Sequence, residues 1–200
     1  ARRDGRVLTM DVFRGPDQGV KRPGLVFIHG GAWVLGDKRE QGLPLCNHLA
    51  SLGWVCANAN YRLSPRATFP DHLVDLKRAV AWIRANVCDF GGDPDFVAVT
   101  GGSAGGHLSS MLALTAGDPE YQPGFEGIDT RVQGCVPFYG VFDLTGGQQH
   151  WPHRSLDRTV ERTVLKLRRE DDPDAFRRAS PLHRVHPGAP PFLVIHGSAD

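Results

Sequence analysis

The chain has 200 residues, which is enough for one domain with a substantial hydrophobic core. Its residues are 40% hydrophobic and 22% charged with a formal net charge of +1, so nucleic acid and acidic membrane surfaces are not expected partners. No apolar run approaches the ~20 residues of a membrane span, and no secretory signal is visible. These features predict a globular, cytoplasmic protein.

Apolar runs and turn signals divide the chain into alternating strands and helices. The expected strands cover residues 7–13, 25–28, 54–59, 97–100, 132–139 and 191–196. The expected helices cover residues 42–52, 69–87, 108–116 and 156–169. This alternation predicts an α/β fold, in which a mostly parallel sheet has helices on both faces.

Residues 144–179 interrupt the alternation because they contain no core-strand pattern. Their expected helix is charged and has one narrow apolar face, formed by Val160, Val164 and Leu167. We expect this stretch to be a lid or cap inserted over a pocket. The whole chain, residues 1–200, is then a single domain with one insertion.

The strongest chemical signal is the pentapeptide Gly101-x-Ser103-x-Gly105 between an expected strand and an expected helix. This order is typical of a nucleophile elbow, in which a serine lies on a strained turn between the two elements. Small neighbours are needed there because larger side chains would collide with the strand and the helix. By itself the pattern also fits an ordinary glycine turn or a phosphate-binding turn. A P-loop is excluded because no Lys-Ser/Thr pair follows the glycines.

A second glycine-rich loop, residues 29–33, follows the strand that should lie beside the central one. Ester hydrolysis by a serine needs a base, an acid that orients the base, and N–H donors for the oxyanion. We expect the N–H groups of Gly31 and Ala32, together with Ala104 after the nucleophile, to be these donors. The remaining residues of the loop support the motif: His29, Gly30 and Trp33.

Several candidate groups follow expected strands, and in a parallel sheet such groups meet at one edge. They are the loop 29–31, Ser103, Asp143 and Asp200. Near this edge, four apolar side chains either line an acyl or alcohol pocket or belong to the core: Trp33, Leu35, Phe142 and Trp151.

Four motifs occur in a fixed order along the chain. They are His-Gly-Gly-x-Trp at 29–33, Tyr-Arg-Leu at 61–63, Gly-Gly-Ser-Ala-Gly-Gly-His at 101–107 and His-Gly-x-x-Asp at 196–200. Together they resemble serine esterases of the α/β-hydrolase fold, in the hormone-sensitive-lipase and feruloyl-esterase-like branches. In this chain Ala32 stands where His-Gly-Gly-Gly has its third glycine. The chain is therefore closer to the His-Gly-Gly-x-Trp branch. The resemblance implies a carboxylesterase for small-molecule esters, with Ser103 as nucleophile and no metal or cofactor.

The resemblance also places the acid of the triad at Asp200. Asp143 is the competing carboxylate, and we expect it to cap or orient its loop instead. The family order of serine, aspartate and histidine puts the base after Asp200, whereas all nine histidines of the chain precede it. We therefore expect a fragment whose catalytic histidine lies beyond residue 200, and which is inactive by itself.

Two other functions stay open. A serine peptidase of the prolyl-oligopeptidase type shares the fold and the His-Gly-x-x-Asp ending. A non-catalytic ligand-binding protein on a hydrolase fold would also lack the histidine.

The chain has four cysteines and no C-x-x-C pair, so a zinc or redox motif is not expected. We expect all four to be reduced and mostly buried: Cys46, Cys56, Cys88 and Cys135.

Overall fold

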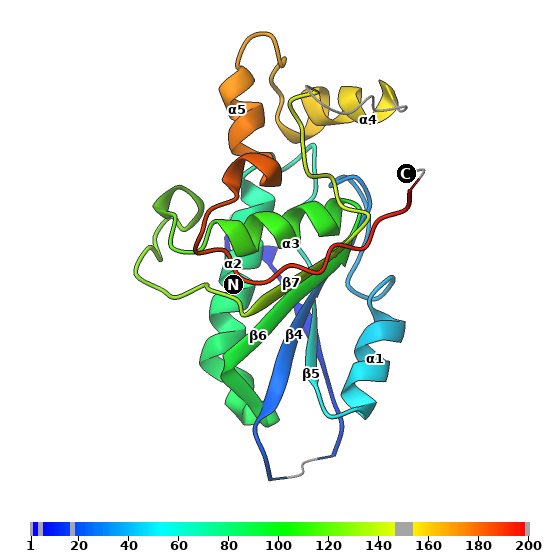
Figure 1. The fold of residues 1–200 in the computed structure, drawn as a ribbon, viewed down its shortest axis with the longest axis vertical. Coiled ribbons are helices and arrows are strands. Elements are labelled where there is room, and N and C mark those ends of the chain that lie inside the picture. The colour runs from blue at the N-terminus through cyan, green and yellow to red at the C-terminus, as the bar shows by residue number, and fades with distance from the viewer. Residues whose placement is uncertain (1, 4–5, 17–18, 147–153, 199–200) are drawn as a thin grey trace.

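A computed structural model describes residues 2–3, 6–16, 19–146 and 154–198 (Figure 1). Its centre is a five-stranded sheet with the order β3-β5-β4-β6-β7. The strands are β3 (Met10–Arg14), β4 (Arg22–Ile28), β5 (Val55–Ala59), β6 (Gly92–Gly102) and β7 (Gly134–Phe138). Within this sheet only the edge strand β3 is antiparallel to its neighbour, which confirms the predicted mostly parallel sheet. A separate two-stranded sheet pairs β1 (Arg2–Arg3) with β2 (Arg6–Val7).

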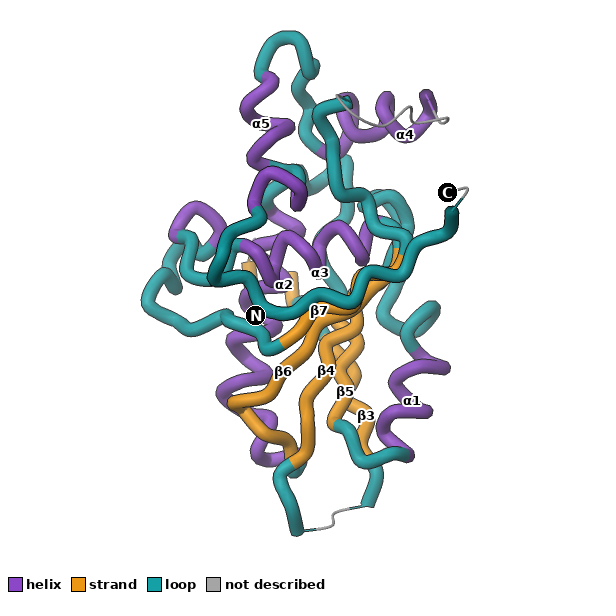
Figure 2. Tube along the Cα trace, in the orientation of Figure 1, coloured by secondary structure: helices purple, strands orange, loops and turns teal. Residues whose placement is uncertain are grey.

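Helices cover both faces of the sheet (Figure 2). Helix α1 (Leu43–Ser51) packs on one face, and α2 (Asp71–Asn86) and α3 (Ala104–Leu114) pack on the other. Successive side chains of a strand point to opposite faces. In β4, Leu25 and Phe27 therefore contact the small core under α1, whereas Val26 and Ile28 belong to the larger core under α2 and α3.

Shorter helices complete the described chain. They are η1 (Val87–Phe90), η2 (Pro119–Tyr121), α4 (Arg154–Thr159), the π-helix η3 (Val160–Val164), α5 (Pro173–Arg178) and η4 (Pro181–Arg184). The predicted helix over 156–169 is wrong for its last five residues, because helical structure ends at Val164. Lys166 adopts a left-handed conformation with φ of 55°, which an α-helix of L-residues does not accommodate.

The predicted strand over 191–196 runs beside β7 but does not form a regular strand. Two isolated parallel bridges join it to β7: Cys135 with Phe192, and Phe138 with Ile195. Pro137 lies between these bridges and has no N–H to donate to the adjacent segment 191–196. The ladder is therefore interrupted at one rung, although the Leu193 N–H still donates to the Cys135 carbonyl at 3.0 Å.

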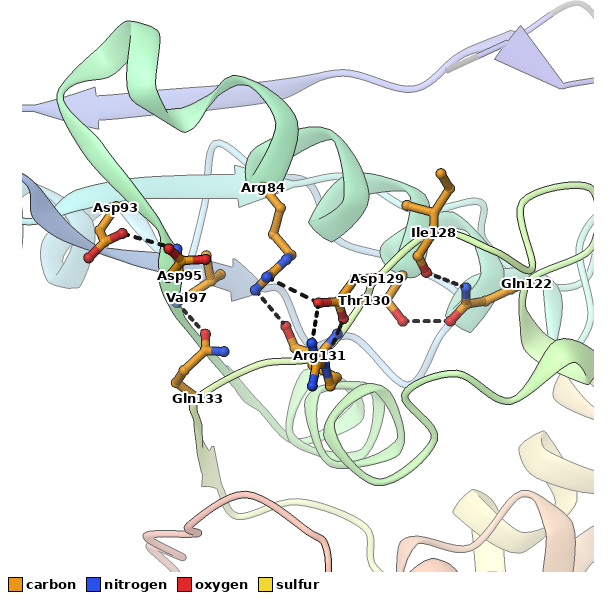
Figure 3. Close-up of polar contacts among 10 residues, drawn as sticks. All are labelled: Arg84, Asp93, Asp95, Val97, Gln122, Ile128, Asp129, Thr130, Arg131 and Gln133. Atoms are coloured by element: carbon orange, nitrogen blue, oxygen red, sulfur yellow. Dashed lines mark hydrogen bonds and ion pairs between the residues drawn. The ribbon is translucent and has the colours of Figure 1, made fainter.

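The loop between α3 and β7 is fastened to α2 and to β6 (Figure 3). Arg84 of α2 donates to the Asp129 carboxylate at 3.1 Å and to the Arg131 carbonyl at 3.2 Å. The Gln133 side-chain oxygen accepts the Val97 N–H at 2.7 Å. These bonds hold the start of β7 against β6, so they fix where the carboxyl end of β7 lies.

Candidate active site

Ser103 lies on the turn between β6 and α3, as the predicted strand–turn–helix order requires. Its backbone has φ of 55° and ψ of −118°, in the left-handed half of conformational space that non-glycine residues avoid. Two backbone hydrogen bonds hold this conformation: the Ser103 N–H donates to the Phe138 carbonyl, and the His107 N–H donates to the Ser103 carbonyl, both at 3.0 Å. Ser103 itself is partly exposed, whereas every residue of α3 is buried.

The glycines on either side of Ser103 allow β4, β6 and α3 to approach closely. A Cβ atom on Gly101 would lie 2.3 Å from the Ile28 carbonyl oxygen, and one on Gly105 would lie 2.1 Å from the same atom. Both distances are shorter than any real contact of a Cβ atom. The pentapeptide therefore needs glycine at both positions because of this packing.

The loop after β4 has three successive residues with positive φ: Gly31 at 112°, Ala32 at 50° and Trp33 at 62°. The preceding Gly30 N–H donates to the Gln41 side-chain oxygen at 2.9 Å. No hydrogen bond among the described residues uses the N–H groups of the three expected oxyanion donors, Gly31, Ala32 and Ala104. The loop also lies against the elbow, since a Cβ on Gly30 would be 2.7 Å from the Gly102 oxygen.

His29 is buried and forms hydrogen bonds within this loop. Its Nδ1 lies 2.8 Å from the Gly30 carbonyl oxygen, and its ring stacks on Tyr61 with centroids 4.3 Å apart. The Tyr61 hydroxyl donates to the His29 carbonyl at 3.0 Å. Burial lowers the pKa of His29, which favours a neutral ring in this position.

Trp33 is fully buried, so the core alternative holds for this residue. Its indole Nε1–H donates to Nδ1 of His107 at 3.2 Å, and Nε2 of His107 lies 2.7 Å from the Ala179 carbonyl oxygen. Phe142, in contrast, lines an apolar cavity of about 590 Å³. Leu35 is exposed, and Trp151 lies outside the described residues.

Asp143 is buried and caps its own loop, as expected for the competing carboxylate. Its Oδ1 accepts hydrogen bonds from the Thr145 N–H at 2.8 Å and the Thr145 hydroxyl at 2.7 Å. Nε2 of His183 lies 3.8 Å from Oδ1. Asp200, the other candidate, lies outside the described residues, so its role stays a prediction.

With this geometry established, comparison with known proteins identifies the family. Residues 10–200 match the family BD-FAE. The chain belongs to the BD-FAE family. The predicted resemblance to esterases of the α/β-hydrolase fold is thereby confirmed.

Curated relatives of this BD-FAE chain include two proteins of Mycobacterium tuberculosis. The "Probable carboxylic ester hydrolase LipM" is 52% identical over 198 residues, which cover 98% of this chain and 46% of LipM. The "Esterase LipQ" is 48% identical over 98% of this chain and 47% of its own length. The chain thus spans about half the length of the curated relatives it matches.

A solved structure supports the same fold. Thermogutta terrifontis esterase 2, described as phosphonylated by sarin, superposes on this BD-FAE chain with a TM-score of 0.86. The two sequences are 25% identical, and the match covers 100% of this chain and 71% of that one. The predicted α/β-hydrolase fold is therefore confirmed.

Features that would suggest other classes of site are absent from the described parts of the BD-FAE chain. None of the helices in these parts is long and apolar enough to cross a membrane. No group of three or more His, Cys, Asp or Glu side chains in residues 2–3, 6–16, 19–146 and 154–198 has an arrangement that could hold a metal ion. All four cysteines are free; Cys88 is exposed and the others are buried.

Two supporting contacts could not be predicted from the motifs. Gln41 precedes α1, and nothing in the sequence around it indicates that its side chain holds the Gly30 N–H. Ala179 is an unremarkable residue after α5, yet its carbonyl accepts a hydrogen bond from a side chain of α3. The first contact joins residues 11 positions apart and the second joins residues 72 positions apart, and only the folded chain shows either of them.

We expect the protein to lose stability as the pH falls from about 6.5 to 4, because two histidines are buried in neutral form. Burial lowers the pKa of both His72 and His107 to about 4 from the ordinary value of 6.5. In this pH range the unfolded chain binds protons at these two histidines that the folded chain does not bind. The stability that the neutral histidines contribute above pH 6.5 is therefore lost on acidification. Each histidine accounts for on the order of 3 kcal/mol in the free energy of unfolding.

Urea unfolding at pH values of about 7.5 and 4.5 measures this effect. The same comparison in His107→Asn should show a smaller difference between the two pH values, because one of the two titrating groups is gone. A free energy of unfolding that stays constant across this range would contradict the assignment.

Proposed function

We propose that this BD-FAE chain is the nucleophile-bearing part of a serine carboxylesterase that hydrolyses small-molecule carboxylic esters. The observation that carries the proposal is the strained backbone of Ser103 between β6 and α3, directly beside a loop in which the Gly31 and Ala32 N–H groups have no hydrogen-bond partner among the described residues. The printed names of LipM and LipQ support the same reaction class. We also propose that the protein uses neither metal nor cofactor and is cytoplasmic.

In the proposed mechanism, the Ser103 hydroxyl oxygen attacks the carbonyl carbon of the ester and gives its proton to a histidine beyond residue 200. That histidine then protonates the alcohol as it departs, and the acyl group remains bound to Ser103. Water, activated by the same histidine, releases the carboxylic acid and regenerates the serine. Asp200 orients the histidine and stabilises its charged form.

The oxyanion that forms in each step is stabilised by backbone N–H groups. Gly31, Ala32 and Ala104 are the proposed donors, and the N-terminus of α3 adds a favourable dipole. The structure supports Gly31 and Ala32 over Gly30, because the Gly30 N–H already donates to Gln41. Losing one such donor typically costs about 3–4 kcal/mol of transition-state stabilisation.

We further propose that residues 144–179 form a cap over this site within a single domain. Figure 1 shows α4 and α5 beyond the carboxyl ends of the strands, which is the edge where Ser103 lies. The segment is attached to the body of the protein by several contacts, including the Phe69 N–H, which donates to the Val164 carbonyl at 2.8 Å. Val160, Val164 and Phe176 are part of the main hydrophobic core.

A fluorophosphonate probe tests the proposed function in the full-length protein that contains this chain. Esterase 2 of T. terrifontis is described as phosphonylated by sarin, which supports this choice of reagent. Peptide mass mapping should find the label on the peptide with Ser103. A panel of p-nitrophenyl esters and aminoacyl-proline amides then separates the two enzyme classes. Faster turnover of the amides would favour a peptidase, and no labelling of a folded protein would favour a binding role.

Separate substitution of the two candidate aspartates by Asn should identify the acid of the triad. We expect Asp200→Asn to lower kcat by about 10⁴-fold, because the histidine is then held in the wrong tautomer. Asp143→Asn is the matched control: the amide oxygen can still accept the two bonds from Thr145, so kcat should change only a few-fold. Turnover of p-nitrophenyl acetate measures both, and the opposite ranking would assign the acid to Asp143.

A further inference from the structure

One buried residue, His107, contacts three separate parts of the proposed site. It lies in the first turn of α3, where its N–H donates to the Ser103 carbonyl at 3.0 Å. Its Nδ1 accepts the indole N–H of Trp33 at 3.2 Å, and its Nε2 lies 2.7 Å from the Ala179 carbonyl oxygen. The nucleophile turn, the proposed oxyanion loop and the inserted segment therefore all contact this residue, the first through its backbone N–H and the other two through its imidazole.

The partners of His107 determine which of its nitrogens carries the proton. The indole Nε1–H of Trp33 is only a donor, so Nδ1 of His107 must present its lone pair. The proton of the neutral ring is then on Nε2, which donates it to the Ala179 carbonyl. Only the neutral Nε2–H form satisfies both contacts. Burial lowers the pKa of His107 to about 4, in agreement with this form.

The contact with Trp33 bears on the oxyanion loop because that loop is strained. Ala32 and Trp33 both have positive φ, and such conformations persist only where surrounding contacts hold them. The Trp33 carbonyl accepts the Ser64 N–H at 2.9 Å, and its indole is held by His107. Trp33 directly follows Gly31 and Ala32, so the position of its indole limits the positions of their N–H groups.

The contact with Ala179 lies at the base of the inserted segment. There the Leu144 N–H donates to the hydroxyl of Ser180, the residue directly after the segment, at 2.8 Å, which joins the start of the segment to the residue that follows its end. The Ser180 hydroxyl in turn donates to the Phe176 carbonyl at 2.7 Å. Ala179 is fully buried next to this hydrogen bond. Its own hydrogen bond to His107 therefore connects the end of the inserted segment to α3.

We propose that His107 is a positioning residue that couples the docking of the inserted segment to the arrangement of the oxyanion loop. This inference rests on the proposed esterase function. Nδ1 orients Trp33, and with it the N–H groups of Gly31 and Ala32, while Nε2 holds the base of the segment. The substrate-binding and oxyanion-binding parts of the site are thereby connected through one side chain that does not touch the substrate.

Two conservative substitutions separate the two contacts. In His107→Asn, the amide oxygen lies near the position of Nδ1 and can accept from Trp33, but the side chain is too short to reach Ala179. In His107→Gln, the amide nitrogen lies near the position of Nε2 and can donate to Ala179, but Trp33 loses its acceptor. Trp33→Phe removes the donor of the same bond independently.

Steady-state ester hydrolysis and fluorophosphonate labelling of the full-length protein measure the outcome. We expect His107→Gln and Trp33→Phe to lower kcat by about 10²-fold with little change in KM, because the oxyanion donors are misplaced. Combining them should lower kcat no further than either alone. The kcat of His107→Asn should be at least tenfold higher than that of His107→Gln, because Trp33 keeps its acceptor. The KM of His107→Asn should rise about tenfold, because the inserted segment loses its hydrogen bond to residue 107.

Limited proteolysis gives a readout that does not depend on catalysis. Cleavage within residues 154–180 should be faster in His107→Asn than in the wild type, and unchanged in His107→Gln. Circular dichroism confirms that each variant is folded, and His48→Asn, on the exposed surface of α1, serves as the control that leaves all parameters unchanged.

Different results would contradict the coupling by His107 and the proposed esterase function. If the wild type is labelled at Ser103 but His107→Asn and His107→Gln show equal kinetics and equal proteolysis, the coupling is wrong and His107 has only a structural role. If the folded wild type neither reacts with the probe nor hydrolyses esters, the proposed function itself is wrong. The difference between Asn and Gln at one position is therefore the deciding result.

Discussion

Replacing Ser103 with Ala is expected to lower kcat for ester hydrolysis by about 10⁶-fold in the full-length protein. The substitution removes the only atom that forms a covalent bond to the substrate in the proposed mechanism. The oxyanion donors and the binding surface remain, so a residual acceleration of about 10³–10⁴ over the reaction in water should be left. Initial rates with p-nitrophenyl acetate and the loss of fluorophosphonate labelling both measure this effect.

Ser109→Ala is a suitable control for Ser103→Ala because it changes the same residue type in the adjoining helix. Ser109 is buried in α3, and its hydroxyl donates to the Gly106 carbonyl of its own helix at 3.0 Å. We expect kcat of Ser109→Ala to stay within a few-fold of the wild type. Full labelling and turnover in Ser103→Ala would show that the nucleophile is another residue and would contradict the assignment of Ser103.

Gly105→Ala is expected to produce the largest loss of stability among single methyl additions at the elbow. The new Cβ would lie 2.1 Å from the Ile28 carbonyl oxygen and 2.9 Å from the His29 carbonyl oxygen. These are backbone atoms, so no side chain can rotate away, and α3 must move relative to β4. We expect the free energy of unfolding to fall by about 3 kcal/mol or more, measured by urea denaturation.

Gly127→Ala provides the matched comparison for this prediction. Gly127 lies in the exposed loop after η2, and a Cβ there would have no neighbouring atom within 4 Å. Its free energy of unfolding should stay within about 0.5 kcal/mol of the wild type. Equal stability of Gly105→Ala and Gly127→Ala would show that the approach of α3 to β4 is looser than the structure indicates.

The parts of the fold that depend on local chemistry could be predicted from the sequence. The elbow needs a serine between glycines at a strand-to-helix turn, and that requirement is visible in five consecutive residues, 101–105. The continuous apolar run of 25–28 likewise indicates a strand buried on both faces, and β4 is such a strand. For these elements, the pattern of each segment is sufficient.

Other features depend on neighbours that are distant in the sequence. Whether 191–196 forms a regular strand is decided by Pro137 on β7, because a ladder needs donors from both partners. The helix over 156–169 looked continuous by apolar spacing, but Lys166 adopts a conformation that ends it. The sequence alone leaves Trp33 equally suited to a pocket or to the core, and its complete burial in the fold assigns it to the core.

The candidate site divides in the same way. Ser103 and the glycine loop could be predicted, since the chemistry restricts the residue types in each short motif. The contacts of His107 could not, because its partners lie 74 and 72 residues away in the chain. Positioning residues of this kind carry no local signature, since many side chains could make the same bonds if the fold brought them there.

The placement of Cys88 has a practical consequence for handling the protein. It is the exposed member of the four cysteines in the chain, and it lies in η1, just before β6 begins at Gly92. Ser103 follows the opposite end of that 11-residue strand, roughly 35 Å away at about 3.3 Å per residue. A maleimide resin or fluorophore attached through this thiol would therefore lie at the end of β6 that is remote from Ser103.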